Sequence, residues 1–190
     1  MKKILVFISI IVVVCMLASC GNDKATTEPK SKTCEQIDPC NLALKYTNAV
    51  EQGAALKVYE YEAKGEKGPH IYDTKEEAEE SISNDYSKYK NKKIEEYGVA
   101  EYTIQRGQSY LYKFKYKALR ENEAGTKSPR TLLVHIYKKN ERYYPVEVFD
   151  YPDLKKIQGN RELKSSQIYY SSNLTSKEKG KFKPKAIEGE

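Results

Sequence analysis

The sequence predicts an α+β domain in which N-terminal helices pack on an antiparallel meander of about four strands. Apolar residues recur at helical spacing between residues 38 and 93. After Tyr97-Gly98 the period changes to two, as in a half-buried sheet, and residues 131–149 follow with the pattern of a β-hairpin. Helices that all precede the strands indicate an α+β architecture.

The first helix is predicted to start at Asp38-Pro39, because Asp is a good N-cap residue and Pro is preferred in the first turn. Apolar residues follow at helical spacing until Gly53 interrupts the pattern: Leu42, Ala43, Tyr46, Ala49 and Val50. Residues 54–63 either continue this helix or form a second, short helix packed at an angle to it.

A further helix is predicted to start at Thr74. Thr74 and Glu77 have the spacing of a capping box, in which each side chain serves the backbone amide of the other residue. Glutamates in the first turn and lysines in the stretch 88–93 suit the helix dipole. One apolar stripe runs along this helix: Ala78, Ile82, Tyr86 and Tyr89.

Four strands are predicted after the helices. In the first strand, apolar and polar residues alternate on either side of Tyr102, and Gly107 marks the turn that follows. The second has an aromatic face with Tyr110, Tyr112, Phe114, Tyr116 and Ala118, and a basic, solvated face with Leu111, Lys113, Lys115 and Lys117. Residues 131–137 and 143–149 complete the hairpin, and residues 168–170 either add an edge strand or drape over the domain.

Residues 1–19 are predicted to be a signal peptide, because Lys2 and Lys3 precede a short apolar run. The tetrapeptide Leu17-Ala18-Ser19-Cys20 resembles the lipobox of bacterial lipoproteins. The resemblance implies cleavage before Cys20 and a diacylglyceryl thioether, with palmitate-type chains, on its sulfur. It also implies an anchor in the cell membrane on the extracytoplasmic side. The alternative is an uncleaved membrane anchor in which Cys20 is an ordinary cysteine.

Composition divides the rest of the chain. Residues 20–37, including the lipidated cysteine, are polar and predict a flexible tether. Residues 38–152 form the predicted globular domain, and residues 153–190 form a polar C-terminal extension that is expected to be largely disordered after residue 171. Net charge falls from +6 to +4 when Lys2 and Lys3 leave with the signal peptide, far from a nucleic-acid-binding signature.

Two cysteines remain after signal-peptide cleavage and lipidation, Cys34 and Cys40. In an oxidising compartment they predict a disulfide that closes a short loop at the root of the first helix. Two free thiols are the nearest alternative. A metal pair is disfavoured, because a site needs more ligands and the chain holds only two histidines.

The order helix, helix and antiparallel meander with a lysine-containing hairpin turn resembles the cystatin-like fold of the nuclear transport factor type. The resemblance covers roughly residues 38–150 and implies a curved sheet. Many small bacterial lipoproteins resemble this fold. Proteins that have it include enzymes, ligand binders and non-catalytic interaction modules, so the fold does not select a function.

Little in the sequence predicts catalysis. His70 lies in a Gly-Pro loop and His135 in a strand, and both are interpreted as structural. The remaining enzymatic hypothesis is an acid–base pair of Glu101 or Glu147 with His135. No glycine-rich phosphate loop is present, and no cofactor or metal is expected.

The main functional hypothesis is a non-enzymatic, membrane-anchored interaction module of the cell envelope. Its partner would be an envelope protein or an anionic wall polymer, and no nucleic acid is expected. The alternative is a small-ligand carrier or sensor that binds at a tyrosine-lined sheet face. That face would consist of four tyrosines: Tyr102, Tyr110, Tyr112 and Tyr116. The alternative interpretation is that these four are core residues in a chain without tryptophan.

Overall fold

The fold is that of a computed structural model, which describes residues 32–62, 70–121, 125–148, 151–159 and 163–187. The predicted signal peptide, the lipobox and Cys20 lie outside the described residues. The described part forms one compact unit.

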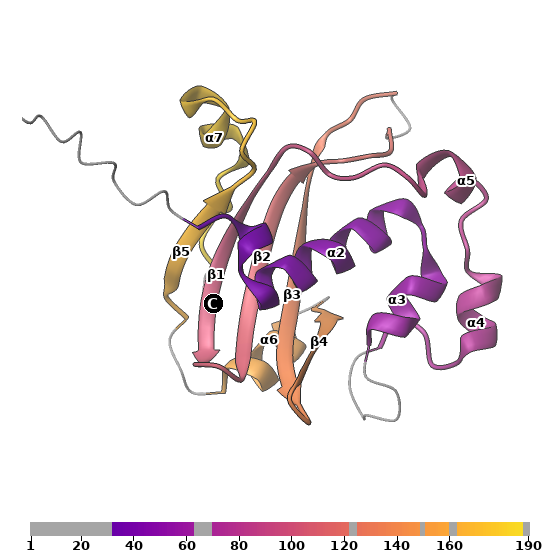
Figure 1. Cartoon of the computed structure of the whole chain (residues 1–190), viewed down its shortest axis with the longest axis horizontal. Coiled ribbons are helices and arrows are strands. Elements are labelled where there is room, and N and C mark those ends of the chain that lie inside the picture. Colours follow the sequence, from indigo (N-terminus) through magenta and orange to yellow (C-terminus); the bar gives the residue numbers. More distant parts are fainter. Residues whose placement is uncertain (1–31, 63–69, 122–124, 149–150, 160–162, 188–190) are drawn as a thin grey trace, which may run out of the picture. The chain divides into compact units, whose positions relative to one another are not determined.

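A single antiparallel sheet organises the fold (Figure 1). Its strands lie in the order β4-β3-β2-β1-β5, so the first four form a meander and the last pairs with the free edge of β1. The α+β prediction is therefore confirmed, with five strands in the described residues where about four were expected. The strands are β1 (Tyr97–Gln105), β2 (Ser109–Lys117), β3 (Pro129–Lys139), β4 (Arg142–Glu147) and β5 (Ser165–Tyr170).

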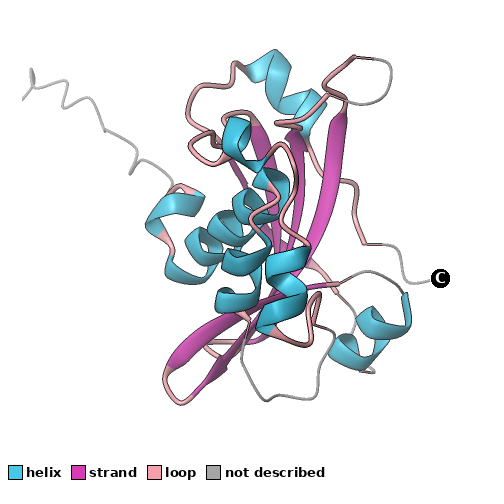
Figure 2. Cartoon of the chain, turned by 90° about the vertical axis from the view of Figure 1, so that its right-hand side faces the viewer, coloured by secondary structure: helices cyan, strands magenta, loops and turns pink. Residues whose placement is uncertain are grey.

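The longest helix, α2 (Asp38–Gln52), lies along one face of the sheet, which we call the helix face (Figure 2). It ends at Gly53, whose φ of 68° is the left-handed conformation that glycine adopts without strain. The shorter helices surround this frame. They are η1 (Cys34–Gln36), α3 (Ala55–Tyr61), α4 (Lys75–Glu80), α5 (Tyr86–Tyr89), α6 (Tyr151–Gln158) and α7 (Ser176–Phe182).

The predicted helix from Thr74 to the lysine-rich stretch is two helices, α4 and α5. Thr74 caps α4 as predicted, because its hydroxyl accepts a hydrogen bond from the Glu77 N–H. The helix then stops, and the Ser83 hydroxyl donates to the Asp85 carboxylate in the interval before α5. Serine and aspartate compete with helix formation through such local bonds, which explains the break.

The main core lies between α2 and the helix face of the sheet. Its largest buried side chains include four tyrosines, and each donates its hydroxyl hydrogen bond to a glutamate. The pairs are Tyr46–Glu62, Tyr97–Glu35, Tyr112–Glu101 and Tyr116–Glu51. A buried hydroxyl without a partner costs about 1–3 kcal/mol, so these pairs are what permits a tyrosine-rich core.

A second, smaller core lies on the opposite face of the sheet, which we call the outer face. Leu154 of α6 and the tail residue Ile187 cover Ala100, Tyr102 and Leu111 there. The lysines predicted to make this face basic and solvated are only partly so. Lys117 is exposed, whereas Lys113 is half-buried and donates to the carbonyl oxygen of Ala186.

Both ends of the domain differ from the composition-based prediction. The predicted tether extends to residue 37, but Cys34 is fully buried and η1 is part of the domain. The extension predicted to be disordered after residue 171 contains α7, which starts with a capping box at Thr175 and buries Phe182. Two well-placed apolar anchors, Leu174 and Phe182, are enough to hold a segment that is polar on average.

Glu51 connects the end of α2 to the sheet. One carboxylate oxygen accepts from the Tyr116 hydroxyl and the Arg130 guanidinium, both at 2.9 Å, and the other accepts from the Leu119 N–H at 3.1 Å. Glu51 is 3% exposed, while the Arg130 side chain is 44% exposed. The buried tyrosine and amide bonds therefore contribute more to stability than the partly solvated ion pair.

We predict that Glu51→Ala lowers the free energy of unfolding by about 3 kcal/mol, because it leaves two buried donors without an acceptor. Arg130→Ala should cost clearly less, about 1 kcal/mol, because Glu51 keeps its two other donors. Urea denaturation of both variants measures the difference. An equal or larger loss for Arg130→Ala would mean that the ion pair is the dominant contact.

Candidate functional site

An open cleft of about 540 Å³ lies at the end of the helix face where β1 turns into β2. Its aromatic wall consists of Tyr110 from β2, Tyr143 from β4 and Tyr169 from β5. Ile37 and Pro39, at the start of α2, add apolar lining. We call this site the tyrosine cleft. Its size falls within the range of ligand pockets, about 300–1,000 Å³.

The turn at Gly107 fixes two of the rings. The Tyr110 hydroxyl accepts a hydrogen bond from the Gly107 N–H at 2.8 Å, and the Tyr143 hydroxyl donates to the Gly107 carbonyl at 3.2 Å. Gly107 has a φ of 74°, which favours glycine at this tight turn. The two rings meet edge to face, with centroids 6.3 Å apart. Their hydroxyls are thus engaged with the protein.

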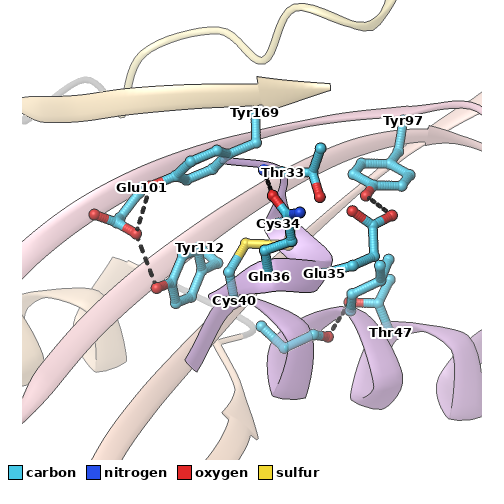
Figure 3. Close-up of a disulfide and its surroundings, with 12 residues drawn as sticks. Thr33, Cys34, Glu35, Gln36, Cys40, Thr47, Tyr97, Glu101, Tyr112 and Tyr169 are labelled. Atoms are coloured by element: carbon cyan, nitrogen blue, oxygen red, sulfur yellow. Dashed lines mark hydrogen bonds between the residues drawn. A yellow bond between two sulfur atoms is a disulfide. The ribbon is translucent and has the colours of Figure 1, made fainter. Parts of the chain in front are cut away.

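Glu101 of β1 contributes a carboxylate to the lining of the tyrosine cleft, and Figure 3 shows its contacts with Tyr112 and Tyr169. Its Oε2 accepts from the hydroxyls of Tyr112, at 3.0 Å, and Tyr169, at 3.3 Å, while its Oε1 accepts from Ser166 at 3.1 Å. Burial and the Glu101 charge raise the pKa of Tyr169 to about 12, and the same two causes raise that of Tyr112 further. Both phenols therefore stay protonated and continue to donate.

The rim of the cleft carries charges of both signs. Lys32 and Arg106 contribute cations, Glu101 contributes its carboxylate and Gln167 an amide. Lys32 and Arg106 are exposed. The cleft therefore presents hydrogen-bond donors and acceptors together with its aromatic wall.

The structure joins Cys34 and Cys40 in a disulfide with an S–S distance of 2.10 Å (Figure 3). Both cysteines are fully buried. Glu35, which lies between them in the sequence, accepts a hydrogen bond from the hydroxyl of Tyr97 in β1. The closed loop holds η1 against α2, which fixes Ile37 and Pro39 on the cleft wall. Closing a loop this short reduces the chain entropy of the unfolded state, which stabilises the fold by about 2 kcal/mol.

Of the four tyrosines predicted to form one ligand face, Tyr110 lines the cleft. Tyr112 and Tyr116 share its face but are buried in the main core. The prediction is wrong for Tyr102, which pairs with Leu111 and therefore points to the outer face. Its hydroxyl accepts from the Ile187 N–H there.

The hypothesis of an acid–base pair around His135 is wrong as well. His135 lies on the outer face with its pairing partners Leu111 and Val146, whereas Glu101 and Glu147 belong to the helix face. The ring accepts or donates at 2.8 Å with the Ser109 hydroxyl. Burial lowers the pKa of His135 to about 4, so it is neutral and a weak base at physiological pH.

A second group of titratable side chains lies between the middle of α2, the end of α3 and the end of β4. The Tyr46 hydroxyl donates to Glu62 at 2.6 Å and accepts from the Glu147 N–H at 3.2 Å. Glu62 also accepts from the Ile71 N–H at 3.3 Å and lies 3.4 Å from Nδ1 of His70. Burial and repulsion by Glu62 raise the pKa of Glu147 to about 7.

No protein-family model, curated protein or solved structure matches the chain. The cystatin-like resemblance therefore stays a prediction. Within the described ranges, no three His, Cys, Asp or Glu side chains are placed to hold a metal ion. Among these same residues, no helix has the length and apolar character needed to cross a membrane.

Glu147 should make stability depend on pH. Because its pKa rises from 4.5 to about 7 on folding, the native state holds this proton more tightly than the unfolded chain. Its contribution is therefore favourable at low pH and is lost as the pH rises toward 7 and above. We predict that Glu147→Gln is more stable than the wild type at pH 8 and that the difference disappears near pH 4. Thermal unfolding across this range is the measurement, and a difference independent of pH would contradict the assigned cause.

Proposed function

We propose that this chain is a non-enzymatic, lipid-anchored binding module of the bacterial envelope, and that it holds its ligand in the tyrosine cleft. The observation that carries the proposal is the fixed aromatic wall. Tyr110 and Tyr143 are half-buried, and both hydroxyls are bonded to Gly107. Their rings are thus ordered before any ligand arrives.

Pre-ordering matters because binding must offset the entropy of fixing side chains, about 0.5–1.5 kcal/mol for each. The tyrosine cleft avoids much of this cost, since its rings are already held by hydrogen bonds and by the Tyr110–Tyr143 contact. Tyrosine also offers a large apolar area with few rotatable bonds. The site therefore suits recognition and favours the ligand-binding hypothesis over a purely protein-protein one.

The non-enzymatic part of the proposal rests on the separation of the reactive groups. His135 and Ser109 contact each other on the outer face, while the carboxylate of the cleft, Glu101, lies on the helix face. A hydrolytic site needs a nucleophile, a base and an orienting acid within reach of one another. The tyrosine cleft and the His135–Ser109 pair are thus on opposite sides of one sheet.

The proposed anchor places the cleft near the membrane. Eleven residues lie between Cys20 and Lys32, which lines the tyrosine cleft. Such a segment spans at most about 40 Å when fully extended. The cleft would therefore work on material within the cell wall or at the membrane surface, not far from it.

Two neighbouring tyrosines of β4 provide a matched test. Tyr143 lines the cleft, whereas Tyr144 lies on the outer face against Tyr137, with ring centroids 5.9 Å apart. Both are half-buried. We predict that the Tyr143→Ala protein no longer captures envelope material when living cells are treated with a cross-linker, while the Tyr144→Ala protein still does.

Cys20→Ala serves as the control for the anchor in the same experiment, and it should lose both lipid labelling and capture. Thermal unfolding of the two tyrosine variants verifies that they are equally folded. Equal capture by Tyr143→Ala and Tyr144→Ala would overturn the cleft as the binding surface. Lipid labelling that persists in Cys20→Ala would overturn the anchor.

A further inference from the structure

The charges around the tyrosine cleft nearly cancel. Two cations, Lys32 and Arg106, line it together with the carboxylate of Glu101. A second carboxylate, Asp38, stands in the first turn of α2 next to Pro39 of the wall. The charge of Asp38 also acts on Tyr143 of the aromatic wall. Burial and Tyr110 are the larger causes that raise the pKa of Tyr143, and Asp38 adds to them. A ligand of high charge of either sign would therefore meet a like charge at the site.

The polar groups of the rim suit hydroxyls and amides. Glu101 supplies acceptor oxygens, Gln167 supplies both a donor and an acceptor, and Arg106 and Lys32 supply donors. A ligand that both donates and accepts at several points matches this mixture. An apolar ligand would make no hydrogen bond with any of these groups.

The aromatic wall adds the third requirement. The negative face of a tyrosine ring attracts weakly positive C–H groups, so rings of this kind pack against the C–H face of a saturated ring. Tyr110 and Tyr143 meet edge to face in the wall, and their hydroxyls are bonded to Gly107. The rings contribute ordered aromatic contact area from two inclined rings, and the polar lining contributes the hydrogen bonds.

We infer that the tyrosine cleft binds a neutral sugar segment, one or two rings of an uncharged envelope glycan. A sugar has a C–H face for the tyrosines and hydroxyls or acetamido groups for Glu101, Gln167 and Arg106. The inference rests on the proposed function and names its ligand class. It replaces the anionic wall polymer, because Glu101 is held in place by three hydrogen-bond donors and cannot turn away from an approaching anion.

The test titrates the full-length, detergent-solubilised lipoprotein with four neutral disaccharides: N,N′-diacetylchitobiose, cellobiose, maltose and lactose. An oligogalacturonate serves as the anionic comparison. We expect saturable calorimetric binding of at least one neutral sugar. Tyr143→Ala should weaken it about tenfold or more, and Tyr144→Ala should change it less than about twofold. Raising the salt from about 50 mM to about 500 mM should leave the affinity nearly unchanged.

Two results would overturn the inference. One is the absence of saturable binding by all four sugars. The other is tighter, salt-sensitive binding of the oligogalacturonate. If either occurs while Tyr143→Ala still loses envelope capture on cells, the proposed function stands and only the ligand class is wrong. If Tyr143→Ala keeps both properties, the tyrosine cleft is not a binding site.

Discussion

The fold depends on pairing buried tyrosine hydroxyls with glutamates. With 17 tyrosines and no tryptophan, the chain fills its core with rings that each carry a polar group. On the helix face, four of these hydroxyls donate to four glutamates from η1, α2, β1 and the end of α3. Each pair satisfies a group whose burial would otherwise cost about 1–3 kcal/mol, and each connects two elements.

The tyrosine cleft lies where this system reaches the end of the sheet. Glu101 receives a buried tyrosine, Tyr112, from the core and a second, Tyr169, from the cleft wall. The same kind of contact therefore stabilises the domain and shapes the site. The disulfide and the Gly107 turn fix the other two sides. A cleft so firmly tied to the core is suited to selective binding without large conformational change.

Local signals in the sequence predicted the elements well. Alternation within β2 correctly separated Tyr110 from Leu111, and the Thr74 capping box correctly started α4. The relation between strands was not predictable in the same way. Tyr102 was assigned to the wrong face because the register across the turn at Gly107, not the period of two, decides which residues of β1 face those of β2. Tyr169 is not predictable from local pattern because it reaches the cleft only when β5 pairs with β1, and the β5 segment gives no clear signal beyond its apolar end. Tyr143 is not predictable in this way because the register of the β3–β4 hairpin decides which face it takes.

Tyrosine-ring NMR of the selectively labelled protein tests the account most directly. With an envelope digest added, the ring signals of Tyr110 and Tyr143 should shift, while those of Tyr137 and Tyr144, on the outer face, should stay in place. That result would locate ligand binding in the tyrosine cleft without assuming which ligand binds. Shifts confined to Tyr137 and Tyr144 would place binding on the outer face and contradict the central claim.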